Sequence, residues 1–150
     1  MHFNQQVSSY YQLFSVFPKV AGVVLQKNTT MTYSNIVQEK AFQFSLHLIP
    51  ICIRLSNEKR EFVLSKQLLK SSTSIGANLE EAIGGFSKKD FHYKISISYK
   101  EARETRYWLK LLIASDLIHI EEGNQLLEEL EGILKILGRT IITLNQKSQA

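Results

Sequence analysis

Apolar residues recur at helical spacing from residue 34 onward. In the first stretch they stand alternately four and three residues apart, which is the spacing of one apolar side of a helix: Val37, Ala41, Phe44, Leu48, Ile51 and Leu55. A second apolar row follows another side of the same segment: Phe42, Leu46, Ile49 and Ile53. Such a helix must be covered on two sides. Pro50 predicts a kink or an end to the regular helix, with the connection over residues 55–60.

Three more helices are predicted by the same reasoning. The second, about 61–83, has the row Phe62, Ser65, Leu69, Ser72, Gly76, Leu79 and Ile83, and Gly84-Gly85 ends it. The third, about 88–114, begins after the capping sequence Ser87-Lys-Lys-Asp90 and has the row Phe91, Ile95, Ser98, Ala102, Thr105, Leu109 and Leu112. The fourth, about 121–145, has the row Leu126, Leu130, Ile133, Leu137, Ile141 and Leu144. Short connections predict an all-α, antiparallel up-down-up-down four-helix bundle.

Residues 1–30 differ from the rest of the chain. They hold no acidic residue, their aromatic residues cluster, and their apolar positions show no helical period. We expect a poorly structured N-terminal extension over 1–30 and the bundle over 31–150. Three interpretations of the extension stay open: a secretory signal, a loosely attached arm, or sequence upstream of a true start at Met31. A signal is disfavoured because its basic beginning is missing.

Composition limits the class of protein. A chain of 150 residues with 44% apolar and 21% charged residues is typical of one globular domain. A single cysteine, Cys52, excludes an intramolecular disulfide and favours a reducing compartment, so we expect a cytoplasmic protein. No apolar run approaches the ~20 residues that span a bilayer, so no membrane partner is expected. The net charge of +4 permits a polyanionic partner without requiring one.

The residues that commonly carry catalysis do not form a recognisable site. A di-iron bundle needs Glu-x-x-His pairs, and none of the four histidines stands in that spacing. Cys52 lies on an apolar helix without a histidine at helical spacing, which is typical of a buried small residue. Glycine-rich phosphate loops are also missing. We therefore expect no metal, no cofactor and no enzymatic activity.

Charge is the strongest functional signal in the sequence. The segment 88–110 holds seven basic and three acidic residues, and its candidate nucleic-acid-binding residues are Lys88, Lys89, Lys100, Arg103, Arg106 and Lys110. One interpretation is a surface that contacts phosphates, with Tyr99 and Tyr107 stacking on bases. The other is a solvated helix face whose charges pair with Glu101 and Glu104, and it is the commoner case in bundles. The surplus of apolar surface also predicts a homo-oligomer.

Three sequence blocks resemble a known family. Leu69-Lys-Ser-Ser-Thr-Ser-Ile-Gly-Ala-Asn-Leu-Glu-Glu-Ala82, Ser87-Lys-Lys-Asp-Phe91 and Lys100-Glu-Ala-Arg-Glu-Thr-Arg-Tyr-Trp-Leu-Lys-Leu-Leu112 are similar to bacterial four-helix-bundle proteins of the 23S rRNA intervening-sequence type. The resemblance covers about residues 34–146. It implies a homopentamer and brings no catalytic residues. The accessory variability protein of diversity-generating retroelements is similar, and it engages nucleic acid and a reverse transcriptase through a basic surface.

The resemblance also marks residues that we expect to determine fold and assembly. They are Ser72, Ile75, Gly76, Ala77 and Asn78 in the first block and Glu104, Thr105, Trp108 and Leu109 in the last. The expected function is that of a non-enzymatic oligomer that binds structured RNA or DNA, or a nucleoprotein, through the basic surface of the third helix. The alternative is a protein-interaction or assembly scaffold without a nucleic-acid role.

Overall fold

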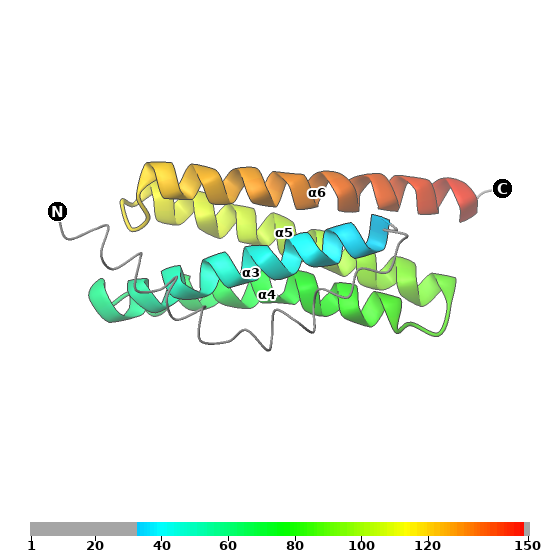
Figure 1. Cartoon of the computed structure of the whole chain (residues 1–150), viewed down its shortest axis with the longest axis horizontal. Coiled ribbons are helices and arrows are strands. Elements are labelled where there is room, and N and C mark those ends of the chain that lie inside the picture. The colour runs from blue at the N-terminus through cyan, green and yellow to red at the C-terminus, as the bar shows by residue number, and fades with distance from the viewer. Residues whose placement is uncertain (1–32, 149–150) are drawn as a thin grey trace, which may run out of the picture. The chain divides into compact units, whose positions relative to one another are not determined.

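The computed structural model describes residues 33–148, and side chains from 36 to 147. The expectation for residues 1–30 lies outside this range. Four helices make up the described part (Figure 1): α3 (Tyr33–Glu58), α4 (Leu64–Ile83), α5 (Lys88–Ala114) and α6 (Ile120–Ser148). No helix among the described residues is long and apolar enough to cross a membrane.

The helices form an antiparallel bundle. α4 packs against α3 and α5, and α6 packs against α5 and α3, so each helix has two main neighbours around a shared apolar core. Short connections reverse the chain between successive helices, and Figure 1 shows all four running lengthwise side by side. The predicted all-α, up-down-up-down four-helix bundle is confirmed.

The two apolar rows of α3 differ in burial. The row from Val37 to Leu55 is buried in the core, as predicted. Pro50 does not end the helix, which continues to Glu58. In the second row, Phe42 is 47% exposed and Ile53 is 50% exposed. We call Phe42, Leu46, Ile49 and Ile53 the α3 apolar strip. The other described helices leave most of it uncovered.

The second helix begins later and faces the core at a different angle than the sequence row predicts. It starts at Leu64, and its buried apolar residues are Leu68, Ile75, Leu79 and Ala82. Phe62 and Ile83 are 55% and 48% exposed, so their place in the predicted row is wrong. The core side of α4 instead includes Leu68, Ser71 and Ile75, which the predicted row left out. Ser71 is enclosed because small side chains fit where helices approach closely.

Buried hydroxyl groups join α4 to α5. Thr105 Oγ1 donates to Ser71 Oγ at 2.9 Å, and Ser98 Oγ donates to the carbonyl oxygen of Ile75 at 2.9 Å. Burying a hydroxyl without a partner is costly, yet no buried side-chain N or O atom within the described range lacks a hydrogen bond. These two bonds therefore hold α4 and α5 in one register.

Glu61 caps the start of α4. Its carboxylate accepts hydrogen bonds from the backbone N–H groups of Val63, Leu64 and Ser65 at 3.0, 2.8 and 2.7 Å. Burial opposes the charge of Glu61, but these donors outweigh it and hold the pKa of the carboxyl below its usual value. A side chain outside the helix thus satisfies three N–H groups that lack a partner within it.

Candidate nucleic-acid interface

Contacts between α5 and α6 define how these two helices line up. Gly123 lies against Ile113, Arg106 Nη1 reaches Glu131 Oε1 at 2.9 Å, and Gly138 lies against Tyr99. Each step forward along α5 is thus matched by one step back along α6. The same register places the start of α5 level with the end of α6.

This register places basic residues of the two helices at the same level along the bundle. Lys100 and Arg103 of α5 lie level with the stretch of α6 that holds Lys135 and Arg139, and all four side chains are exposed. We call Lys100, Arg103, Arg106, Lys135 and Arg139 the basic face. Lys88 and Lys89 are exposed at the start of α5, level with Lys147. Lys110 is exposed but lies level with Leu127 and Glu128, beside the acidic part of α6.

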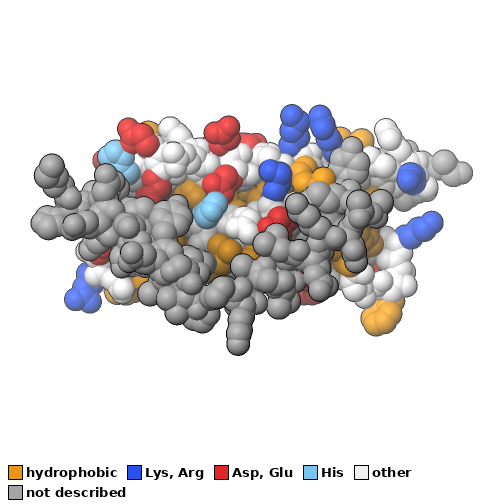
Figure 2. Space-filling view, viewed as in Figure 1, with side chains coloured by type: hydrophobic (Ala, Val, Ile, Leu, Met, Phe, Trp, Pro, Cys, Tyr) orange, Lys and Arg blue, Asp and Glu red, His pale blue; other side chains and the backbone are white. Residues whose placement is uncertain are grey.

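Charge is distributed unevenly along α6. Its first half holds Glu121, Glu122, Glu128, Glu129 and Glu131, whereas after Glu131 it holds only basic charged residues. Figure 2 shows acidic side chains gathered toward one end of the bundle, with Lys and Arg side chains further along. Lys135 and Arg139 were missed by the sequence reasoning, which placed the candidate binding residues on the third helix. The antiparallel order of the helices was the signal that pointed to them.

The acidic residues of α5 make no direct ion pair with the basic face in the described part of the chain. None of the ion pairs among the described residues joins Glu101 or Glu104 to a base of this face. The pKa of Glu101 is raised, first by burial and next by the charge of Glu104. The charge of Lys70 on α4 lowers this pKa, which indicates that Glu101 lies toward α4. Glu104 accepts a hydrogen bond from Trp108 Nε1 at 3.1 Å. Arg106 is the one basic side chain of this face that makes an ion pair among the described residues, and its partner is Glu131 of α6.

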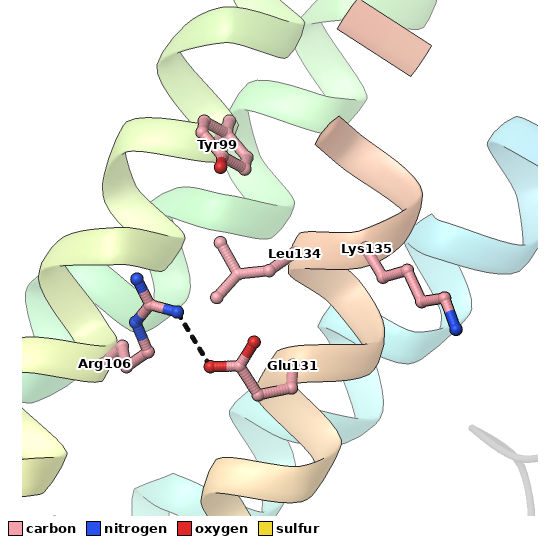
Figure 3. Close-up of a pocket in the computed structure, with 5 residues that line it drawn as sticks. All are labelled: Tyr99, Arg106, Glu131, Leu134 and Lys135. Atoms are coloured by element: carbon pink, nitrogen blue, oxygen red, sulfur yellow. Dashed lines mark hydrogen bonds and ion pairs between the residues drawn. The ribbon is translucent and has the colours of Figure 1, made fainter. Parts of the chain in front are cut away.

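A hollow of about 380 Å³ lies within the basic face, between α5 and α6. Its lining residues are Tyr99, Arg106, Glu131, Leu134 and Lys135 (Figure 3). Tyr99, one of the two tyrosines that the sequence offers for stacking, is half-buried. The other, Tyr107, is 59% exposed and meets Trp108 edge to face at 4.9 Å between ring centroids. The hollow is open to solvent and combines an aromatic ring with charged groups of both signs.

The residues marked for fold and assembly occupy three kinds of position. Ser72, Ile75, Thr105 and Leu109 are fully buried. Gly76, Asn78 and Trp108 are half-buried; Asn78 donates to the carbonyl oxygen of Ser74 at 2.8 Å, within its own helix. Ala77 and Glu104 are exposed.

The described residues offer little for catalysis. No group of three His, Cys, Asp or Glu side chains within them is placed to hold a metal ion. Cys52 is 4% exposed, and burial, aided by the charge of Glu61, raises the pKa of its thiol to about 11. A thiol of that pKa is protonated at neutral pH and is a poor nucleophile.

Comparisons with known proteins agree with this architecture. A comparison with curated proteins found no significant match. A solved structure of a protein of unknown function from the S23 ribosomal protein family of Bacteroides thetaiotaomicron shares 41% sequence identity. The match covers 73% of this chain and 98% of that one, with a TM-score of 0.71. Residues 33–139 match the family described as 23S rRNA-intervening sequence protein, and the chain therefore belongs to this family.

Proposed function

We propose that the protein is a non-enzymatic, oligomeric four-helix bundle that binds structured nucleic acid or a nucleoprotein through the basic face. The observation that carries the proposal is that α6 adds Lys135 and Arg139 to the basic residues of α5. Four of the five basic side chains of the basic face make no ion pair among the described residues. Contacts with phosphates require exposed basic side chains without an ion-pair partner, and two adjacent helices supply them here.

The affinity of this face depends on how many phosphates it contacts. The logarithm of the binding constant falls with the logarithm of salt concentration by about 0.9 for each contacted phosphate of duplex DNA, and by about 0.7 for single strands. One subunit has few basic side chains, contacts few phosphates and therefore binds weakly. An oligomer multiplies the face and raises affinity without any new kind of contact.

Charge reversal tests the proposal directly. The variant combines Lys100→Glu, Arg103→Glu and Arg139→Glu, and spares Arg106 because a glutamate there would face Glu131. We expect that this variant no longer raises the fluorescence anisotropy of labelled structured RNA or duplex DNA at low salt. Its helical circular dichroism should stay unchanged. The matched control reverses Lys40, Lys59 and Lys66, which are exposed and lie outside the basic face. Equal binding by both triple variants contradicts the proposal.

A second candidate function has its own observation. The α3 apolar strip leaves Phe42, Ile49 and Ile53 37–50% exposed on one helix. Contiguous exposed apolar surface marks protein interfaces. The protein would then serve as an assembly scaffold without a nucleic-acid role. A protein partner that co-purifies with the wild type and is lost when Phe42 becomes serine, together with no nucleic-acid binding at low salt, favours this scaffold.

A further inference from the structure

Glu131 is the unexpected member of the hollow. A carboxylate only accepts hydrogen bonds and repels phosphate, so it adds nothing to a phosphate-binding face. Arg106 uses one N–H group to reach one oxygen of Glu131. Within the described residues, the second oxygen of Glu131 and the other N–H groups of Arg106 have no hydrogen-bond partner. The hollow therefore presents free acceptors and free donors side by side.

We propose that the hollow binds an unpaired guanine base. This inference rests on the proposed nucleic-acid function and names the feature that the basic face recognises. The Watson–Crick edge of guanine presents the carbonyl O6 beside two N–H donors, N1–H and N2–H. The two oxygens of Glu131 fit the two donors, and a guanidinium N–H of Arg106 fits O6.

The other bases fit this pair of side chains less well. Adenine and cytosine each present one amino group beside a ring nitrogen that accepts. Uracil presents one N–H between two carbonyl groups. Each of these bases leaves an oxygen of Glu131 without a donor or sets an acceptor against it. Only guanine has adjacent donors for both oxygens of the carboxylate, next to an acceptor for the arginine.

The remaining lining suits a planar base. Leu134 is 6% exposed, and Figure 3 shows its side chain between Tyr99 and the Arg106–Glu131 pair. The ring of Tyr99 offers an aromatic surface, and stacking on such rings is a general means of holding unpaired bases. Lys135 extends away from the other four side chains (Figure 3). The volume of about 380 Å³ lies near the lower end of small-ligand sites, about 300–1,000 Å³.

A purely structural role for the Arg106–Glu131 pair predicts something different. The Arg106 side chain is 31% exposed and that of Glu131 is 53% exposed. Ion pairs this open to solvent stabilise a fold only slightly. If the pair only links α5 to α6, its removal changes stability a little and leaves base preference unaffected.

Three RNA hairpins with one stem test the inference. The loop contains a single guanine, an inosine that lacks the N2 amino group, or an adenine at the same place. We expect the wild type to bind the guanine loop roughly tenfold more tightly than the adenine loop, with inosine between them, as for a good two-bond base contact. Glu131→Gln should abolish this preference, because an amide has a single acceptor oxygen.

Matched variants separate base reading from charge. Glu128→Gln makes the same change of net charge on an exposed side chain of the same helix, outside the lining of the hollow. It should tighten binding to all three hairpins and keep the guanine preference. Tyr99→Phe should keep the preference, and Tyr99→Leu should weaken guanine-loop binding several-fold.

The outcomes distinguish this inference from the proposed function. Tight binding of all three hairpins without preference overturns the guanine site and leaves the proposed function standing. If no hairpin binds, the proposed function fails, and guanosine monophosphate is titrated against the protein while the methyl signals of Leu134 are followed. A shift specific to guanosine over adenosine monophosphate then assigns the hollow to a free nucleotide. No shift at millimolar concentration overturns the guanine site as well.

Discussion

Glu61 shows how one side chain outside a helix can determine where that helix begins. Periodicity predicted a start near residue 61, because Phe62 and Ser65 fit the apolar row. The structure starts α4 at Leu64 and uses Glu61 as the cap. Apolar spacing does not reveal which side chain turns back to accept backbone N–H groups, so this role could not be predicted from the row alone.

Replacing Glu61 by glutamine should lower stability in a pH-dependent manner. Loss of a capping carboxylate costs about 0.5–2 kcal/mol. Because the pKa of Glu61 is lowered in the folded state, the charged carboxylate stabilises the fold above the unfolded value of 4.5, and this contribution is lost as pH falls through the folded pKa. Urea unfolding of wild type and Glu61→Gln at neutral pH and at about pH 3 measures this.

A control variant identifies the carboxylate responsible for this pH dependence. Glu58→Gln removes an exposed carboxylate at the end of α3 and should change stability little at either pH. A constant difference between wild type and Glu61→Gln across the pH range would contradict the capping role.

Cys52 should be chemically inert in the folded protein. With its pKa raised to about 11 and its side chain 4% exposed, only about one thiol in a thousand is ionised at pH 8, and reagents cannot reach it. A chromogenic disulfide reagent should react at least a hundredfold more slowly with native than with urea-unfolded protein. Equal rates would show that α3 opens readily. The sequence-based interpretation of Cys52 as a buried small residue agrees with its observed burial.

At the scale of the helices, apolar spacing was accurate for α3, α5 and α6 and misphased for α4. Large apolar residues mark the core side of a helix clearly, whereas α4 carries Ser71, Ser72, Ser74 and Gly76 along its middle. These side chains give no clear apolar signal, and their burial depends on hydrogen bonds that the spacing does not reveal. Ser71 accepts from Thr105 of α5, whereas Ser72 donates to the carbonyl oxygen of Leu69 in its own helix.

Gly76 should accept alanine and reject leucine. A Cβ at this position would lie 4.0 Å from Ala41 Cβ, an ordinary contact. Gly76→Ala should therefore raise the free energy of unfolding by up to about 1 kcal/mol through helix propensity. Gly76→Leu should lower it by about 1–3 kcal/mol, because its further atoms meet α3. Denaturant titration measures both.

Gly132→Ala serves as the matched comparison for Gly76→Ala. Apart from the neighbouring backbone of α6, no atom of the described residues lies within 4 Å of a Cβ at residue 132, so this variant reports the propensity gain alone. A loss of stability in Gly76→Ala, with a gain in Gly132→Ala, would show that α3 and α4 approach more closely than the structure indicates. Unchanged stability in Gly76→Leu would mean that residue 76 faces open solvent.

At the scale of the whole molecule, the class of fold was predictable and the interface only partly so. Four helical patterns joined by short connections leave few alternatives to a bundle. The basic residues of α5 were evident, but Lys135 and Arg139 join them only through the register of α6. Arg106 illustrates the reverse case: it belongs to the basic run in the sequence, yet α6 brings Glu131 against it. Charge patterning along one helix does not determine what a neighbouring helix adds or neutralises.

The α3 apolar strip predicts that the wild type assembles with itself. Phe42 and Ile53 lie about half exposed on the same helix. Removing such side chains from water contributes about 25 cal/mol per Å² of apolar surface, which offsets the entropy cost of association. Light scattering should give a mass of several chains at micromolar concentration. The double variant Phe42→Ser, Ile53→Ser should give the mass of one chain with unchanged helix content.

The matched control for this experiment changes a polar position of α3. Gln43→Ser alters an exposed residue next to Phe42 whose side chain donates to Glu39 of its own helix, so the assembly should persist. A single-chain mass for the wild type contradicts the oligomer, and an unchanged large mass in the double variant moves the interface away from α3. Loss of assembly with a parallel loss of RNA affinity, at an unaltered basic face, would show that binding depends on several copies of that face acting together.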